Sequence, residues 1–221
     1  MTYDPFMAAT VVGKVVRRNA QGERVRAEIL DAASRIMSED GYEGASISAI
    51  IKESGIQKSS IYWQFDSKAA IAAAVMERGA RRFFDAYSHR RTRGKPATRL
   101  ETHLTDISNN LDEHEEFLRL FLTLLITNRD PAVAAVLERV RSEALASMRG
   151  LIETSFDAEG PRVASLIADR LAELGVALFD GFFLSAQIEE ADKRNRRVRD
   201  MARALAYYGE AIAAEQRSAS R

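Results

Sequence analysis

This chain lacks the residues on which several classes of protein depend. It has no cysteine, which excludes a disulfide framework and a thiolate metal site. Its three histidines, at positions 89, 103 and 114, have no metal-ligand spacing beyond Asp112-x-His114, a pair more typical of a solvated helix start. Gly-rich phosphate loops, the Gly-x-Ser-x-Gly motif and a Cys nucleophile are also missing. We therefore predict that the chain is not an enzyme and uses no cofactor or metal ion, and a helical enzyme remains only a remote alternative.

Long hydrophobic runs are missing too. The longest apolar run, at about residues 117–126, is too short to span a bilayer and is interrupted by Arg119. The N-terminal residues lack the long apolar segment, preceded by positive charges, that a secretion signal needs. We therefore expect a cytoplasmic protein with no membrane partner.

The chain has no net charge, since 32 Lys and Arg balance 32 Asp and Glu. Alone, this balance argues against a nucleic-acid-binding protein. The charges are distributed unevenly, however: residues 1–96 carry sixteen basic and eleven acidic side chains, and the remainder carries sixteen and twenty-one. This polarity favours a DNA-facing N-terminal part. Lys14, Arg17 and Arg18 could form a basic arm on DNA, and a solvated tail is an equally good interpretation.

Residues 24–71 are the most informative part of the sequence, because helical patterns and turn signals alternate there. A first helix with an apolar stripe ends at Gly41, and Ser46 is a good N-cap for a second helix. Gly55 ends the second helix in a tight turn, and Ser67 caps a fourth helix. The second and third helices therefore form a predicted helix-turn-helix at about residues 46–65, whose second helix would enter a DNA major groove.

The exposed face of this third helix carries amide, ammonium, hydroxyl and aromatic groups, which base edges and phosphates accept. Spacing alone also allows a generic three-helix bundle that does not bind DNA. The predicted DNA-binding residues are Ser46, Gln57, Lys58, Ser59, Ser60, Tyr62, Trp63 and Lys68.

This segment closely resembles the DNA-binding domain of the TetR family of transcriptional regulators, over roughly residues 23–83. The most specific part of the resemblance is the pattern Tyr-x-x-Phe-x-x-Lys at positions 62, 65 and 68. Other matching residues are Ile29-Leu30-Asp31-Ala32-Ala33, Gly41-Tyr42, Ser46-Ile47, Ile50, Gly55-Ile56, Ser60-Ile61, Trp63-Gln64 and Ser67. The resemblance implies that Tyr62 and Lys68 bind phosphates and that residues 57–59 lie nearest the base edges. Gln57, Ser59 and Gln64 depart from the residues common in the family, so the operator sequence stays open.

The rest of the chain is predicted to be helical, giving an all-α protein of about nine helices. Asp130-Pro131 and Gly160-Pro161 begin two of these helices, and a charged turn at residues 193–196 separates the last two. We predict three regions: a flexible basic arm at 1–22, the helix-turn-helix domain at 23–83, and a helical effector-binding and dimerisation domain at 84–221.

The last two helices carry an association signal. Small residues interrupt a long apolar helix, where glycine costs about 1 kcal/mol relative to alanine, so close helix approach is a plausible compensation. The alternative is that these apolar stripes face their own core. The predicted dimer-interface residues are Gly175, Phe179, Gly181, Phe182, Leu205, Tyr208 and Ile212.

An effector pocket is implied by the family resemblance, and aromatic and apolar residues with a few polar groups are the candidates for its lining. Ordinary core positions are the favoured alternative for each of them. A buried Asp180 would favour a cationic ligand. The predicted pocket residues are Phe84, Tyr87, His103, Phe117, Phe121, Met148, Asp180 and Phe183.

Together these observations predict a homodimeric, ligand-responsive repressor that binds a palindromic operator in double-stranded DNA. A small, mostly apolar effector would release it. An activator or a nucleoid-type DNA-binding protein without an effector is the alternative, and ligand-sensitive DNA release distinguishes the two.

Overall fold

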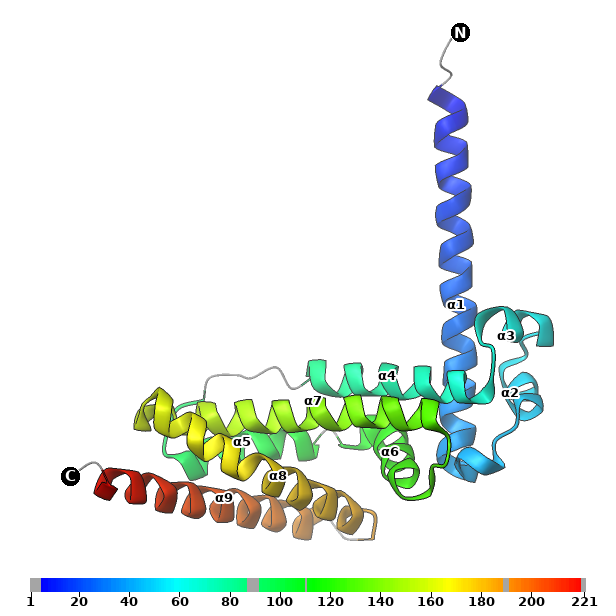
Figure 1. Ribbon diagram of the computed structural model, residues 1–221. Coiled ribbons are helices and arrows are strands. Elements are labelled where there is room, and N and C mark those ends of the chain that lie inside the picture. The colour runs from blue at the N-terminus through cyan, green and yellow to red at the C-terminus, as the bar shows by residue number, and fades with distance from the viewer. Residues whose placement is uncertain (1–4, 87–91, 110, 189–190, 220–221) are drawn as a thin grey trace. The chain divides into compact units, whose positions relative to one another are not determined.

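The computed structural model describes residues 5–86, 92–109, 111–188 and 191–219, and within these ranges the chain is helical and contains no β-strand (Figure 1). The all-α prediction of about nine helices is confirmed. The elements are α1 (Pro5–Gly44), α2 (Ile47–Ser54), α3 (Lys58–Gln64), α4 (Lys68–Ala86), α5 (Pro96–Asn109), η1 (Leu111–His114), α6 (Glu115–Thr127), α7 (Pro131–Ser155), η2 (Asp157–Glu159), α8 (Pro161–Ala186) and α9 (Ala191–Ala219). In the described part of the chain, none of the helices combines the length and the hydropathy that a bilayer crossing requires.

The chain divides into two compact units. The first contains Met1–Arg78 and Glu116–Val136, and the second contains Gly79–Glu115 and Leu137–Arg221. The predicted boundary at residue 84 placed α6 in the second domain, whereas the structure groups most of α6 with the N-terminal helices. One reason is a side-chain hydrogen bond, in which Ser34 Oγ of α1 donates to Glu116 Oε2 of α6 at 2.9 Å.

Local signals set the ends of the short helices in the first unit. Ser46 caps α2, since its side-chain oxygen accepts from the Ala49 N–H at 3.0 Å, and Ser67 caps α4 by accepting from the Ala70 N–H at 3.1 Å. Gly55 ends α2 in the left-handed conformation, with φ 67°, where a side chain would be strained. These caps and this turn were predicted from the sequence and are confirmed.

Helix α1 differs from the prediction at its N-terminal end. Residues 5–22 continue the helix, where a flexible arm was expected, so that α1 runs for 40 residues from Pro5 to Gly44. Only two glycines interrupt this stretch, and isolated glycines weaken a helix without ending it. At the other end Gly41 leaves the helical conformation, with φ 73° and ψ 169°, which agrees with the predicted helix end.

The core of the first unit is built from one apolar side of α1 and from single anchors on the short helices. Ile29 and Met37 of α1 are buried, as are Ile50 of α2 and Ile61 of α3. Arg78 of α4 adds an ion pair, in which its Nη1 lies 2.8 Å from Asp31 Oδ1 of α1. These anchors fix which side of α3 remains outside.

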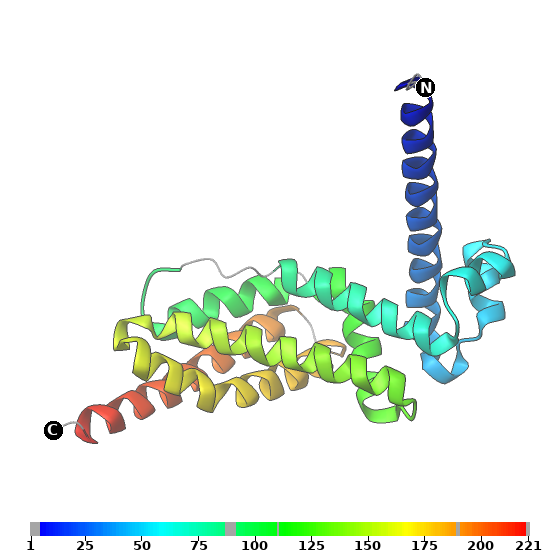
Figure 2. The same ribbon diagram turned by 45° about the horizontal axis from the view of Figure 1, so that its top comes forward.

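The second unit is formed by α5, α8, α9, the short helices η1 and η2, and the parts of α4 and α7 that belong to it. Helix α9 packs against both α5 and α8, and α8 lies beside α9 in both views (Figures 1 and 2). The predicted charged turn at residues 193–196 is wrong, since these residues lie inside α9. Lysine and arginine are good helix formers, so a run of them does not end a helix.

Candidate nucleic-acid interface

Helix α3 presents its polar residues outward because only one of its residues is fully buried. Ile61 is inaccessible to solvent, whereas Tyr62 and Trp63 are 45% and 77% exposed. Lys58 and Ser59 are also exposed. An exposed tryptophan on a seven-residue helix is not explained by packing within the chain, so this face is available to a partner.

The start of α3 is held by the turn that precedes it. Gln57 occupies the N-cap position and is exposed, and its side chain makes no capping hydrogen bond. The Ile56 N–H instead donates to Ser54 Oγ at 3.2 Å, which orders the turn between α2 and α3. The amide of Gln57 is therefore not used in the cap. Ser60, also a predicted contact, is half-buried.

Two lysines lie next to tyrosine rings in or near α3. Lys58 Nζ is 5.8 Å from the centre of the Tyr62 ring, one turn away on the same helix. Lys68 Nζ is 4.3 Å from the centre of the Tyr42 ring, within the range of a cation–π interaction. The two lysines differ in exposure, because Lys58 is exposed and Lys68 is half-buried.

Lys68 is also bound to the end of α1. Its ammonium donates to the Tyr42 carbonyl oxygen at 2.9 Å, and Glu43 Oε2 lies 3.9 Å away. Burial raises the pKa of the Tyr42 hydroxyl, and Asp130 and Glu43 add to the shift. An ammonium has three donors, so Lys68 can keep this bond and still meet a phosphate. Its phosphate contact stays a prediction, and its structural contact is an additional role.

Sequence reasoning missed two residues that position α3. Gln64 Nε2, in the last turn of α3, donates to the Gly22 carbonyl oxygen of α1 at 3.1 Å. The Arg26 guanidinium of α1 lies 4.4 Å from the centre of the Phe65 ring, directly after α3. Neither contact has a local sequence signal, since 42 residues separate the hydrogen-bonded pair. The contacts fix the C-terminal end of α3 against α1.

The predicted effector residues are divided between the two units. Phe117 and Phe121 belong to the first unit, where their rings stack with centres 6.0 Å apart. Tyr87 lies outside the described residues. The second unit contains the remaining five: Phe84, His103, Met148, Asp180 and Phe183.

Most of these five pack as ordinary core. Phe84 is half-buried and lies edge-on to the Phe83 ring at 5.3 Å, and His103 is buried with its Nε2 3.4 Å from Thr92 Oγ1. Asp180 pairs with Arg141 of α7, with Oδ2 and Nη1 2.6 Å apart. Because this arginine already compensates its charge, Asp180 does not support the expectation of a cationic ligand. Phe183 is the one predicted residue that lines a described cavity.

The predicted dimer-interface residues divide between the core and the surface. Gly175, Phe182, Leu205 and Ile212 are buried inside the protomer, so they cannot form its outer surface. Gly175 lies against Met148, since a Cβ at this position would be 2.8 Å from the Met148 Cγ atom. This corrects the prediction for these four residues: the alternative, that the stripe faces its own core, holds for them.

The other predicted interface residues lie further out. Phe179 is half-buried against the Phe83 ring, with centres 6.2 Å apart. Gly181 is exposed, and a Cβ there would meet nothing within 4 Å. Tyr208 is also exposed, so two of the seven residues belong to the surface.

A second apolar stripe on α8 and α9, which we call the outer stripe, faces away from the protomer core. Its residues are exposed and recur every three or four positions along each helix, with two adjacent tyrosines on α9, as expected for one face of a helix. The outer stripe consists of Leu174, Ala177, Gly181 and Leu184 on α8 and Ala204, Tyr207, Tyr208 and Ala211 on α9. Sequence reasoning missed Leu174, Leu184 and Tyr207, because α8 and α9 carry apolar residues on both sides.

Comparison with known proteins identifies the N-terminal unit. Residues 29–75 match the family of bacterial regulatory proteins, tetR family. The chain is 37% identical over 60 residues to the A-factor receptor protein of Streptomyces griseus, a match that covers 27% of this chain and 22% of that protein. Because the match spans so little of this relative, it concerns the DNA-binding domain alone.

Solved structures extend the similarity to the whole fold. The full-length TetR regulator TylP from Streptomyces fradiae matches with a TM-score of 0.61 and 25% identity, covering 86% of this chain and 87% of that chain. A TetR-family regulator from Agrobacterium tumefaciens matches with a TM-score of 0.63 and 15% identity, over 85% and 98% of the two chains. These relatives are regulators, which supports the prediction that the chain is not an enzyme. Residues 29–75 thus match the tetR family of bacterial regulatory proteins, and the fold of the chain is similar to that of solved TetR-family regulators.

Proposed function

We propose that the chain binds a palindromic operator in double-stranded DNA as a homodimer and represses transcription in the cytoplasm. The observation that carries the proposal is the outward face of α3, where Gln57, Lys58, Ser59 and the two exposed aromatic residues have no packing role in the protomer. Side chains of this kind recognise base edges and phosphates, and the helix-turn-helix delivers them to the major groove.

The outer stripe supports the homodimer. Exposed apolar residues along two adjacent helices are unusual for a monomer, and Tyr207 among them is 78% exposed. Two copies of α8 and α9 would bury this surface in a four-helix interface related by a two-fold axis. A two-fold dimer presents two copies of α3, which suits a palindromic operator.

A small effector would act through this dimer. In our proposal it binds the second unit in a state whose two α3 helices have the wrong separation for the operator. DNA affinity then falls by the ratio of the effector's affinities for the two states. The A-factor receptor protein, whose match lies in the DNA-binding segment, is a receptor by its name. This name supports a ligand-responsive function for the present chain.

Footprinting and fluorescence anisotropy on DNA that flanks the protein's own gene test the proposal. We expect a protected, two-fold symmetric site whose binding weakens steeply with salt. Lys58→Ala should lower affinity and change sequence preference by about 1–3 kcal/mol at one base pair. Arg162→Ala is a matched control, because it removes an exposed positive charge at the start of α8 in the second unit.

Two results would count against the proposal. If wild type and Lys58→Ala bind every tested DNA sequence equally well, α3 does not recognise bases as proposed. Operator binding that no small molecule weakens would favour the alternative of an activator or nucleoid-type protein without an effector.

A further inference from the structure

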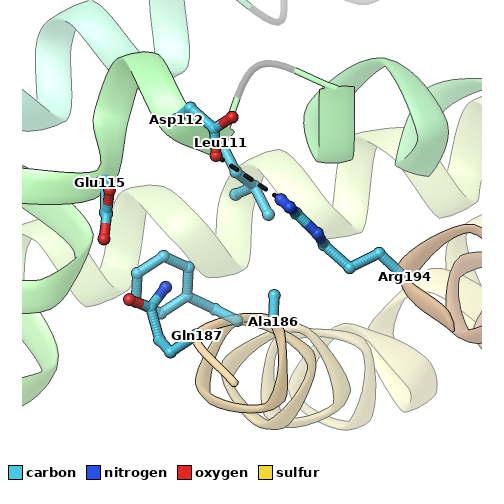
Figure 3. Close-up of a pocket in the computed structure, with 7 residues that line it drawn as sticks. Leu111, Asp112, Glu115, Ala186, Gln187 and Arg194 are labelled. Atoms are coloured by element: carbon cyan, nitrogen blue, oxygen red, sulfur yellow. Dashed lines mark ion pairs between the residues drawn. The ribbon is translucent and has the colours of Figure 1, made fainter. Parts of the chain in front are cut away.

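The second unit contains a polar cavity of about 190 Å³ at one end of α8. It lies between η1, the first residue of α6, the end of α8 and the first turns of α9 (Figure 3). Leu111 and Phe183, both buried, supply its apolar wall. Ala186 adds a small apolar contact, and charged and amide side chains supply the rest, namely Asp112, Glu115, Gln187 and Arg194.

Charges of both signs line this cavity from different elements. Arg194 projects from α9 toward η1, and Glu115 lies on the other side of the cavity, above Gln187 (Figure 3). Asp112 stands nearest to the guanidinium, with Oδ1 and Nη1 3.5 Å apart. The three charged groups sum to one negative charge, so neither a simple anion nor a simple apolar molecule matches the lining.

Arg194 uses little of its hydrogen-bonding capacity. Its ion pair with Asp112 is longer than the about 2.7–2.9 Å of a charge-assisted hydrogen bond, and that carboxylate is 84% exposed to water. Its Nε is buried and has no acceptor. Since a guanidinium has five N–H donors, the half-buried Arg194 can donate to an additional oxygen ligand at the cavity wall.

The volume limits the occupant to a small molecule. A cavity of about 190 Å³ would hold about six waters at about 30 Å³ each, which is below the about 300–1,000 Å³ of sites for drug-sized ligands. A molecule of amino-acid size fits this space, and a large lipophilic compound does not.

We propose that this cavity binds a small zwitterion that carries one carboxylate and one ammonium group, as amino acids do. The ligand carboxylate accepts hydrogen bonds from the Arg194 guanidinium. The ligand ammonium donates to the Glu115 carboxylate and to the Gln187 amide oxygen, and its carbon skeleton packs on Phe183. As a proposal about the effector class, it rests on the proposed ligand-responsive function, but binding itself does not.

The test uses the full chain without DNA. The standard protein amino acids and γ-aminobutyrate are screened by thermal shift, and hits are measured by isothermal titration calorimetry. For each hit, the amine that lacks its carboxylate and the acid that lacks its ammonium are titrated in parallel, as 3-methylbutylamine and 4-methylpentanoate would be for leucine. We expect the zwitterion to bind at least about tenfold more tightly than either counterpart.

Variants locate the site. Arg194→Met should weaken binding at least about tenfold, whereas Arg196→Met, which removes an exposed positive charge from the same helix, should not. If Arg194→Met fails to fold by circular dichroism, Glu115→Gln replaces it and should weaken binding of the ammonium group. The inference is overturned if no zwitterion binds at millimolar concentration, if a singly charged counterpart binds equally well, or if both cavity variants bind like wild type.

A second readout separates this inference from the proposed function. A zwitterion that binds at Arg194 but leaves operator DNA bound supports the site and removes that ligand as the effector. Lipophilic compounds that release DNA while no zwitterion binds would overturn the site and leave the ligand-responsive repressor intact.

Discussion

Helices α3 and α8 differ in how many of their residues are buried and on how many sides they are apolar. Helix α3 has seven residues and one fully buried anchor, Ile61, so its exposed positions are available to a partner. Helix α8 has 26 residues, of which nine are buried, and it also carries the exposed apolar residues of the outer stripe. A short helix with one anchor has one possible orientation, whereas a long helix with two apolar sides has two, and only its packing partners decide between them.

The largest expected effect concerns the outward side of α8. Gly181→Leu places an isobutyl group where the protomer has free space, and leucine favours a helix over glycine by about 1 kcal/mol, so the protomer should fold normally. In the proposed dimer the added group overpacks the interface on both copies, at about 3 kcal/mol together. Sedimentation should then show a dimer dissociation constant raised about a hundredfold.

Ala146→Leu is the control for this change, since it adds a side chain at an exposed position of α7 that is not part of the outer stripe. It should leave the dimer intact. If Gly181→Leu dimerises as well as wild type, the outer stripe is not the interface.

The inward side of the last two helices should respond in the opposite way. A Cβ at the buried Gly209 of α9 would overlap the ring of Phe156, which is itself buried, so Gly209→Ala should destabilise the protomer by about 1–3 kcal/mol. At Gly175 the neighbour is the flexible Met148 side chain, so Gly175→Ala should be destabilising by less. Urea unfolding of both variants measures the order, and a larger effect at Gly175 would contradict it.

The next change tests the surface around α3 at Lys68, the first residue of α4. Lys68→Met keeps the stem on Tyr42 and removes the ammonium that donates to the Tyr42 carbonyl. We expect a loss of about 1 kcal/mol of stability, because the bond is charge-assisted but partly solvated. If the same ammonium also binds a phosphate, the slope of log affinity against log salt concentration should fall by about 0.9.

Lys95→Met, on an exposed loop residue, is the matched control for Lys68→Met. A stability loss without a change in salt slope would assign Lys68 to positioning α4 alone. An unchanged stability would contradict the structural role.

The smallest expected effect is a pH dependence of the stability, which arises at His114 in the second unit. Burial lowers the pKa of His114, an effect to which Arg82 adds and which Glu113 opposes. The ring packs edge-on against Phe83, which in turn contacts Phe179 of α8. The unfolded chain therefore binds a proton more readily, so stability should be complete above pH of about 6.5 and fall as pH drops below it.

Thermal melts of wild type and His114→Phe between pH 5 and 8 check this sign. The phenylalanine variant should lose less stability on acidification. An identical pH profile for the two proteins would show that His114 is not the group responsible.

Local chemistry explains which parts of the fold could be predicted. Ser46, Gly55 and Ser67 act on backbone groups within three or four residues, so the sequence nearby contains the whole interaction. The orientation of α3 follows from its one fully buried residue, Ile61, and could also be predicted from the sequence. The contact of Gln64 with Gly22 and the packing of Met148 on Gly175 join distant parts of the chain, and no short pattern encodes them.

The same reasoning explains the errors in α8 and α9. Leu205 and Tyr208 were placed on one stripe, yet the first is buried and the second is exposed. Their spacing of three allows a shared face, but a wide apolar surface wraps around the helix and crosses from the core to the outside. The identity of the inward side depends on α5, which packs on α9 from nearly a hundred residues away.

The three-residue helix η2 has a consequence for the kinetics of folding. Arg99 of α5 binds Asp157 through two hydrogen bonds of 2.6 and 3.1 Å, and Arg217 of α9 binds Glu159 in the same turn. Each arginine is 58 residues from its carboxylate, one before the turn and one after it. The first pair can form only once α5 lies against this turn, and the second only once α9 has returned to it, so each pair closes a loop of 58 residues, which forms more slowly than a local contact. Contacts that form after the transition state slow unfolding and leave the folding rate unchanged, so we expect the loss of either arginine to shorten the lifetime of the folded second unit more than it slows its folding.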